Sequence, residues 1–158
     1  MTQGTLVLAA PAKINLFLHV TGRRADGYHL LESVFACIDF ADTLTLAARA
    51  DGAIVRTHDV AGIPADEDLA VRAARALQMA AGVQRGVAIT VEKRIPQGAG
   101  LGGGSSDAAS VLLGLNRLWH LDWPRARLAA LGATLGADVP FFIGGEPAMV
   151  RGIGERVS

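Results

Sequence analysis

The sequence has a single cysteine, no excess of charge of either sign and no long apolar run, and each absence excludes a class of protein. Because Cys37 is alone, neither an intrachain disulfide nor a thiolate zinc site can form. The 15 Lys and Arg residues balance the 15 Asp and Glu residues, which gives no support to a general binder of nucleic acids or anionic membranes. No apolar stretch reaches the roughly 20 residues that cross a bilayer, and Met1–Gly4 does not open a signal peptide. We therefore expect a cytoplasmic protein with no nucleic-acid or membrane partner.

What the sequence does contain is typical of one globular domain. Its 158 residues are 51% apolar and 19% charged, which is enough to bury a single core. No internal repeat or low-complexity tract divides them, so residues 1–158 are expected to form one domain. Cys37 lies in the apolar run of residues 34–38, which favours a packing thiol over a nucleophile.

Alternation of side chains predicts strands in the first half of the chain. Residues 12–20 alternate, and this places Lys13 and Asn15 on one face with Ile14 on the other. A polar loop is expected over residues 21–29. Further strand patterns cover residues 33–46, 54–55 and 87–91.

Three other stretches have helical periodicity and end signals. The expected helices run from Asp66 or Asp68 to Ala81, over residues 108–118, and from Asp122 to Leu135. Gly82 and Gly136 follow the first and the last of them as stops. Residues 141–143 and 148–150 flank the turn at Gly144–Gly145. Because strands and helices mix without strict alternation, the pattern predicts an α+β fold and not a doubly wound sheet.

The most informative segment is glycine-rich and leads directly into a helix. Five of the seven residues from Gly98 to Gly104 are glycine, and Ser105–Ser106 follow. Glycine lets the backbone approach a ligand closely, and the first amides of a helix have no intrahelical acceptor. These amides also carry the positive end of the helix dipole, so the segment predicts a seat for phosphate oxygens. A flexible linker is the alternative, but so many glycines between a strand and a well-formed helix disfavour it.

Two common phosphate-binding loops do not fit this segment. No Gly-Lys-Ser/Thr follows the glycines, so the loop is not of the Walker type. Gly98, Gly100 and Gly103 satisfy the spacing G-x-G-x-x-G, but dinucleotide binding also needs an acidic residue at a strand end about 20 positions on. At that distance lies Asp122, which is expected to cap a helix.

The segment Pro96–Ser106 closely resembles the phosphate-binding motif of the GHMP kinases. Three further segments, Pro11–Leu18, Arg24–His29 and Gly136–Phe142, resemble one branch of that family. Members of the branch use ATP to phosphorylate the 2-hydroxyl of 4-diphosphocytidyl-2-C-methyl-D-erythritol, in the non-mevalonate route to isoprenoid precursors. The resemblance implies the N-terminal domain fold of GHMP kinases, which is like domain 2 of ribosomal protein S5, with a mixed sheet packed against helices. It also implies a second, C-terminal domain that this chain does not contain.

The resemblance assigns roles to individual residues. Lys13 and Asp138 are implied as the catalytic pair, and Asn15, Tyr28 and His29 as contacts to the cytidine or methylerythritol part of the substrate. Asp68 stands where the resemblance implies an Asn near the adenine. Ser105 or Ser106 could reach the Mg²⁺ expected to accompany ATP. The residues implied to hold the ATP phosphates are Pro96, Gln97, Gly98, Ala99, Gly100, Leu101, Gly102, Gly103, Gly104, Ser105 and Ser106.

Each assignment has an alternative in the residues themselves. Asp138 suits a proton acceptor, but it could also cap a short helical turn before Pro140. Lys13 could hold a carboxylate ionised, or it could be an ordinary lysine on an exposed sheet face. Tyr28 and His29 could recognise a pyrimidine or simply occupy a surface turn. For the whole chain, the alternatives are another GHMP small-molecule kinase, a nucleotide-binding module without turnover, and an RNA-binding domain, for which the neutral composition gives no support.

Overall fold

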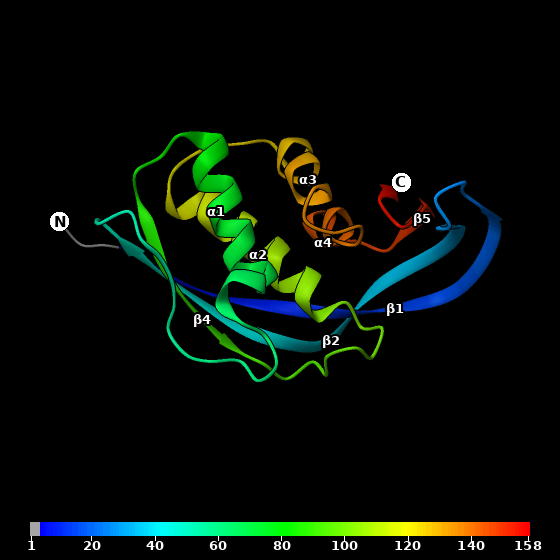
Figure 1. The fold of residues 1–158 in the computed structure, drawn as a ribbon, viewed down its shortest axis with the longest axis horizontal. Coiled ribbons are helices and arrows are strands. Elements are labelled where there is room, and N and C mark those ends of the chain that lie inside the picture. Colours follow the sequence, from blue (N-terminus) through cyan, green and yellow to red (C-terminus); the bar gives the residue numbers. More distant parts are fainter. Residues whose placement is uncertain (1–3) are drawn as a thin grey trace.

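A long antiparallel hairpin dominates the computed structural model, which describes residues 4–158. Its strands are β1 (Thr5–Arg23) and β2 (His29–Arg49), which pair along nearly their whole length (Figure 1). The first three residues, on which the expectation about a signal peptide partly rests, lie outside the described residues. No helix within residues 4–158 is long and apolar enough to cross a membrane.

The remaining strands complete one mixed sheet around β2. On the edge of β2 opposite β1, β4 (Gly86–Glu92) pairs with its C-terminal half and β5 (Ala148–Gly152) with its N-terminal half, both antiparallel. β3 (Ile54–Arg56) runs parallel to β4, and β6 (Arg156–Val157) pairs with β5. The expected mixed sheet is therefore confirmed.

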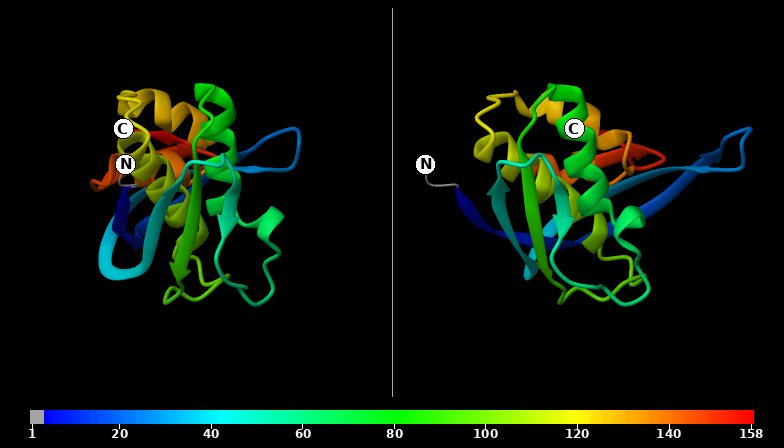
Figure 2. Two further views of the ribbon diagram at one scale, coloured as in Figure 1. Left: turned by 90° about the vertical axis from the view of Figure 1, so that its left-hand side faces the viewer. Right: turned by 60° about the vertical axis from the view of Figure 1, so that its left-hand side comes forward.

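The helices gather on one face of this sheet, as Figures 1 and 2 show. They are α1 (Leu69–Ala81), α2 (Gly103–Leu118), α3 (Arg125–Ala133) and α4 (Val139–Gly144), with a short 3-10 turn η1 (Ala65–Glu67) before α1. α2 lies centrally, in contact with α1, α4 and both long strands. The core between sheet and helices includes the fully buried side chains of Leu44, Leu46, Leu77, Ile89, Leu112 and Leu115. This arrangement confirms the α+β prediction.

Local capping signals set the ends of α1. The carboxylate of Asp68 accepts a hydrogen bond of 2.9 Å from the backbone N–H of Ala70, so Asp68 and not Asp66 is the cap. At the other end, Gly82 has a φ of 65°, a left-handed conformation that glycine adopts without strain. Each end of α1 depends on a single residue next to it in the sequence, so the sequence predicted both ends closely.

Several boundaries differ from the predictions. The expected loop over residues 21–29 is shorter than predicted and covers only residues 24–28, because β1 continues to Arg23 and pairs there with His29, the first residue of β2. Backbone pairing across a hairpin needs no particular side chains, so polar residues did not end the strands. Residues 141–143 lie in α4, and α3 covers only Arg125–Ala133.

The hairpin end also departs from the simple alternation predicted for residues 12–20. The pairing register shifts between Asn15 and Phe17 and twice more along β1, and each shift bends and twists the strand. The end of the hairpin that carries the turn, called the outer hairpin below, extends away from the helices (Figure 2). Its apolar side chains remain exposed: Leu16 has 61% of its surface exposed and Val20 has 62%. Cys37, expected to be buried, is half-buried on β2, and burial raises the pKa of its thiol.

Candidate active site

The glycine-rich loop takes left-handed backbone conformations at every second residue before α2. Gly98, Gly100 and Gly102 have φ values of 72°, 76° and 71°, which residues with a Cβ rarely adopt. Gly102 directly precedes α2, and its carbonyl oxygen accepts the N–H of Ser106 at 2.9 Å. The amides before Ser106 in the first turn have no acceptor within the helix, so they are available to a ligand.

This loop forms one wall of a cavity of about 440 Å³. Lys13 reaches the cavity from β1 and Asp138 from the residue before α4, while Lys93 follows β4. The remaining lining residues are Ile63, Leu69 and the continuous run from Pro96 to Ser105. Residues from four distant parts of the chain therefore meet around the loop.

Gly102 is also where the loop packs against the rest of the site. A Cβ at this position would lie 2.9 Å from the ring of Phe142 and 3.2 Å from Cγ of Lys13. Only glycine fits this gap without displacing its neighbours. The backbone N–H of Lys13 donates to the carbonyl oxygen of Leu101 at 2.9 Å, which attaches the loop to β1.

Lys13 is a buried lysine, only 6% exposed, in the wall of the cavity. Its Nζ donates to Oδ1 of Asn15 at 2.5 Å and lies 4.2 Å from the centre of the Phe35 ring. Burial lowers the pKa of Lys13, and the negative charge of Asp138 partly opposes this effect. The contact with Asn15 agrees with the prediction that both side chains share one face.

Asp138 is the acidic group that lines the cavity. It precedes α4, but its side chain makes no hydrogen bond to the first turn, so the capping alternative is not realised. Burial raises the pKa of the Asp138 carboxyl, and the charge of Lys13 opposes the rise. The two groups thus influence each other's pKa, although the ion pairs of 4.0 Å or less within residues 4–158 do not include one between Lys13 and Asp138.

The structure separates the other predicted site residues into two groups. Ser105 lines the cavity, whereas Ser106 is fully buried and its hydroxyl has no hydrogen-bond partner in the described part of the chain. Tyr28 and His29 lie at the turn of the hairpin, Tyr28 with 62% of its surface exposed, and neither lines the cavity. The cavity therefore unites Lys13 and Asp138 with the loop but not with the aromatic pair.

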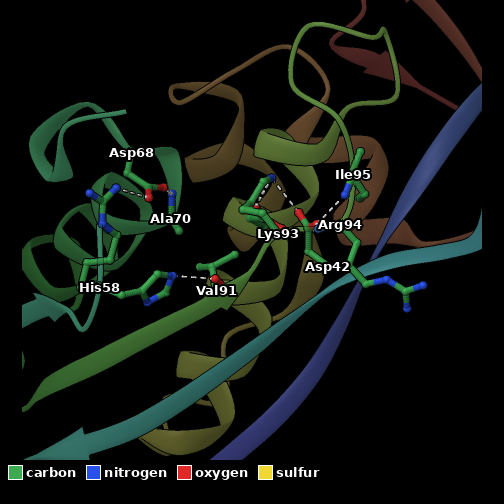
Figure 3. A network of polar contacts seen from close by, with 10 residues as sticks. Asp42, His58, Asp68, Ala70, Val91, Lys93, Arg94 and Ile95 are labelled. Carbon is green, nitrogen blue, oxygen red and sulfur yellow. Dashed lines mark hydrogen bonds and ion pairs between the residues drawn. The ribbon is translucent and has the colours of Figure 1, made fainter. Parts of the chain in front are cut away.

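A buried ionic network next to the cavity was not predicted (Figure 3). Nζ of Lys93 donates to Oδ2 of Asp42 at 2.7 Å and to Oδ2 of Asp107 at 2.9 Å. Burial and a hydrogen bond with Asp42 raise the pKa of Asp107 to about 8. Burial acts to raise the pKa of Asp42 as well, but its hydrogen bonds outweigh burial and lower that pKa. The signal in the sequence was an aspartate, Asp42, inside the apolar strand pattern of residues 33–46, although Asp39 in the same pattern takes no part in the network.

A second cavity of about 290 Å³ adjoins the first one, and the two share Ile63, Leu69, Lys93 and Gly104. Its other charged lining residues are Glu67, Asp68 and Asp107. Both carboxylate oxygens of Asp68 are engaged, one by the N–H of Ala70 and the other by Nη1 of Arg56 at 2.9 Å. The rest of the lining is mainly apolar and consists of Val60, Gly62, Ile63, Leu69 and Val91.

Known proteins resemble this chain in both sequence and fold. The sequence model described as "GHMP kinases N terminal domain" matches residues 68–146. The 4-diphosphocytidyl-2-C-methyl-D-erythritol kinases of Ralstonia nicotianae and Methylibium petroleiphilum are 62% and 64% identical over 149 residues. In both cases the match covers 94% of this chain and 52% of the relative, so the chain spans about half the length of these relatives.

The structural comparison gives the same result. A crystal structure of 4-(cytidine 5'-diphospho)-2C-methyl-D-erythritol kinase superposes with a TM-score of 0.81 at 48% identity, covering 97% of this chain and 54% of that one. The mevalonate kinase of Methanococcus jannaschii superposes with a TM-score of 0.71 at 15% identity, covering 98% and 55%, which shows a shared fold. These comparisons confirm the predicted resemblance. Because the model of the family's N-terminal domain matches half of the residues of this chain, the chain belongs to the GHMP kinases.

Proposed function

We propose that this chain is the ATP-binding, catalytic half of a kinase that phosphorylates the 2-hydroxyl of 4-diphosphocytidyl-2-C-methyl-D-erythritol. The observation that carries the proposal is the single cavity in which the glycine-rich loop faces both Lys13 and Asp138. The curated relatives at 62% and 64% identity support the choice of substrate. In this proposal residues 1–158 form the N-terminal domain of the kinase, which corresponds to about half the length of these relatives.

The phosphates of ATP are bound by the loop in this mechanism. The backbone amides of Gly98–Ser105 donate to phosphate oxygens, and the dipole of α2 favours the negative charge. The second cavity continues from the first past Gly104, and its mainly apolar wall suits the adenine. Asp68 lies in that wall with its charge already paired to Arg56.

Lys13 and Asp138 carry the chemistry of transfer. Asp138 accepts the proton of the attacking hydroxyl, for which its burial-raised pKa makes it a stronger base than an exposed aspartate. Lys13 stabilises the charge that develops on the reacting oxygens from its buried position in the cavity wall. Phosphoryl transfer depends mainly on such positioning and charge stabilisation, so two side chains and a loop are a sufficient set.

Magnesium fits this site as an ion that arrives with the nucleotide. No cluster of three or more His, Cys, Asp or Glu side chains that could hold a metal occurs within residues 4–158. Mg²⁺ typically keeps several waters and uses only one or two protein oxygens beside the phosphates. Ser105 supplies such an oxygen at the cavity wall. Bound there, Mg²⁺ would neutralise phosphate charge.

The substrate contacts of Asn15, Tyr28 and His29 remain part of the proposal. Asn15 is held next to Lys13, where its amide can reach an acceptor hydroxyl. Tyr28 and His29 lie outside the cavity, at the turn of the hairpin whose strand β1 carries Lys13. An elongated substrate such as a cytidine diphosphate ester suits this arrangement. The exposed apolar side chains of the outer hairpin offer surface for its pyrimidine end.

The test is transfer of labelled phosphate from ATP to the cytidylyl substrate. It is performed with the 158-residue chain alone and with this chain joined to the C-terminal half of the Ralstonia nicotianae relative. Phosphorylation by the joined protein, abolished by Lys13→Ala or Asp138→Ala with the fold intact, is the expected result. Transfer to homoserine or mevalonate but not to the cytidylyl substrate would instead identify another GHMP kinase.

A nucleotide-binding module without turnover is the second candidate. It is favoured by one observation, that the chain spans about half the length of its relatives. ATP binding by both proteins, with no phosphate transfer by either, would support this candidate.

A further inference from the structure

The two ends of the glycine-rich loop lie next to each other, although the loop itself is exposed. Ile95 precedes the loop and is buried, and its Cγ2 lies 2.9 Å from where a Cβ of Gly103 would be. Gly103 is the first residue of α2. The missing side chain at Gly103 therefore lets the end of the loop approach its beginning.

Asp42 fixes the beginning of the loop. This side chain of β2 is fully buried, and its Oδ1 accepts the backbone N–H groups of Arg94 at 2.6 Å and of Ile95 at 2.9 Å (Figure 3). Its Oδ2 accepts from Nζ of Lys93. Three consecutive residues before the loop are thus bound by one carboxylate.

Lys93 extends this connection to the end of the loop. Besides Asp42, its Nζ donates to Oδ2 of Asp107, a buried residue in α2. The same Nζ would lie 3.4 Å from a Cβ at Gly103, so the ammonium group packs directly over the helix start. A chain of contacts therefore runs from β2 through Lys93 to the helix whose first amides face the cavity.

We propose that Asp42, Lys93 and Asp107 form a clamp, in which Asp42 is a positioning residue that sets the phosphate-binding amides without touching the nucleotide. The proposal rests on the proposed function for its effect on ATP. A loop rich in glycine has many conformations to lose, and binding is strongest when they are lost before the ligand arrives. The clamp limits those conformations from both ends, since it joins the segments on either side of the loop.

The decisive comparison uses the isosteric variant Asp42→Asn. Its oxygen still accepts from Arg94 and Ile95, but an NH₂ group now faces the ammonium of Lys93, so the hydrogen bond between residue 42 and Lys93 is lost. Lys93→Met removes the hydrogen bonds to both Asp42 and Asp107 and leaves Asp42 bound to the backbone, while Lys93→Arg retains a cation that can reach both side chains. The matched control is Asp51→Asn, which alters an exposed carboxylate that also binds an arginine and a backbone amide, but far from the loop.

The first measurement is amide hydrogen exchange in the chain without nucleotide. We expect exchange over residues 97–105 to accelerate at least roughly tenfold in Asp42→Asn and Lys93→Met, with α1 unchanged and with protection restored in Lys93→Arg. Asp51→Asn should resemble the unaltered chain. If Asp42→Asn does not fold, the exchange rates of Lys93→Met and Lys93→Arg can be compared instead. Unchanged exchange in the loop, or equal acceleration in the loop and in α1, would overturn the clamp.

The second measurement is the dissociation constant of Mg·ATP, determined by calorimetry for the same variants. Asp42→Asn and Lys93→Met should weaken binding by about tenfold or more, because displaced amides lose their alignment with the phosphates. Equal affinity in these variants and in the unaltered chain would refute the positioning role. If the unaltered chain does not bind Mg·ATP, the proposed function fails, and hydrogen exchange still decides whether the clamp exists.

Discussion

The backbone N–H of Lys13 and the carbonyl oxygen of Leu101 form a hydrogen bond of 2.9 Å. This bond joins the strand that supplies the proposed catalytic ammonium to the loop that we propose binds the phosphates. Because it involves only the backbone, the side chain of Lys13 can be changed without releasing the loop. Effects on catalysis and on loop position can therefore be separated by mutation.

Lys13→Ala is expected to lower turnover of the joined, full-length protein by roughly 10²–10³-fold. The ammonium that stabilises the developing charge is lost, whereas the hydrogen bond to Leu101 remains. Affinity for Mg·ATP, measured by calorimetry, should change by only a few-fold. Turnover within tenfold of the unaltered protein would contradict the assignment of Lys13.

Asp138→Asn is expected to lower turnover by roughly 10²–10⁴-fold, because the proton acceptor is removed. The melting temperature should not fall, since this side chain does not cap α4 and a buried neutral amide avoids the cost of desolvating a carboxylate. In the unaltered protein, the raised pKa of Asp138 should move the acid limb of the pH–rate profile above the ordinary value of 3.8. An acid limb at or below that value would argue against Asp138 as the base.

Gly102→Ala tests the close packing of the loop. The new Cβ would meet Phe142 at 2.9 Å and would sit on a backbone with a φ of 71°, so we expect destabilisation of about 1–3 kcal/mol in chemical denaturation. Gly144→Ala is the control, because no atom lies within 4 Å of its Cβ position and its φ is not in the left-handed range. Similar denaturation midpoints for the two variants would mean that Gly102 does not need to be glycine.

Asp107 should make the fold less stable as pH rises. The pKa of Asp107 is about 8 in the folded chain, whereas its ordinary value, which applies to the unfolded chain, is 3.8. Between pH 3.8 and about pH 8 the folded chain therefore holds a proton that the unfolded chain has released. The free energy of unfolding should then fall with increasing pH, by at most about 1.4 kcal/mol per pH unit. Asp107→Asn cannot titrate, and urea denaturation from pH 5 to 8 should show a flatter profile for it. An equal slope in both proteins would show that Asp107 is already ionised at neutral pH.

Asp68→Asn should be costly because it leaves a buried cation without its partner. The side chain of Arg56 is 4% exposed and that of Asp68 13%, and removing one member of a buried pair typically costs about 3–5 kcal/mol. The asparagine can still cap α1, so the loss reports mainly on the ion pair. Asp66→Asn, which alters an exposed pair with Arg75, should change the denaturation midpoint very little. A small effect at position 68 would mean that Arg56 finds another partner.

Local signals in the sequence were sufficient for the loop and for the C-terminal end of α1, and they narrowed the start of this helix to Asp66 or Asp68. Positive φ at Gly98, Gly100 and Gly102 and the cap at Asp68 depend on residues within one or two turns, and such effects can be read directly from composition and spacing. The boundary of the hairpin was not predictable in this way. Its strands continue through polar residues because each strand satisfies the backbone of the other.

By itself, the sequence determined the glycine-rich loop, the helix that it starts and the resemblance to GHMP kinases, because each is contained in a continuous segment. Only the tertiary structure decided which charged groups meet. Lys13 and Asp138 come together at one cavity, and Asp42, Lys93 and Asp107 form one network, although each comes from a different part of the chain. Their protonation depends on burial and on these distant partners, and neither quantity is contained in the local pattern of residues.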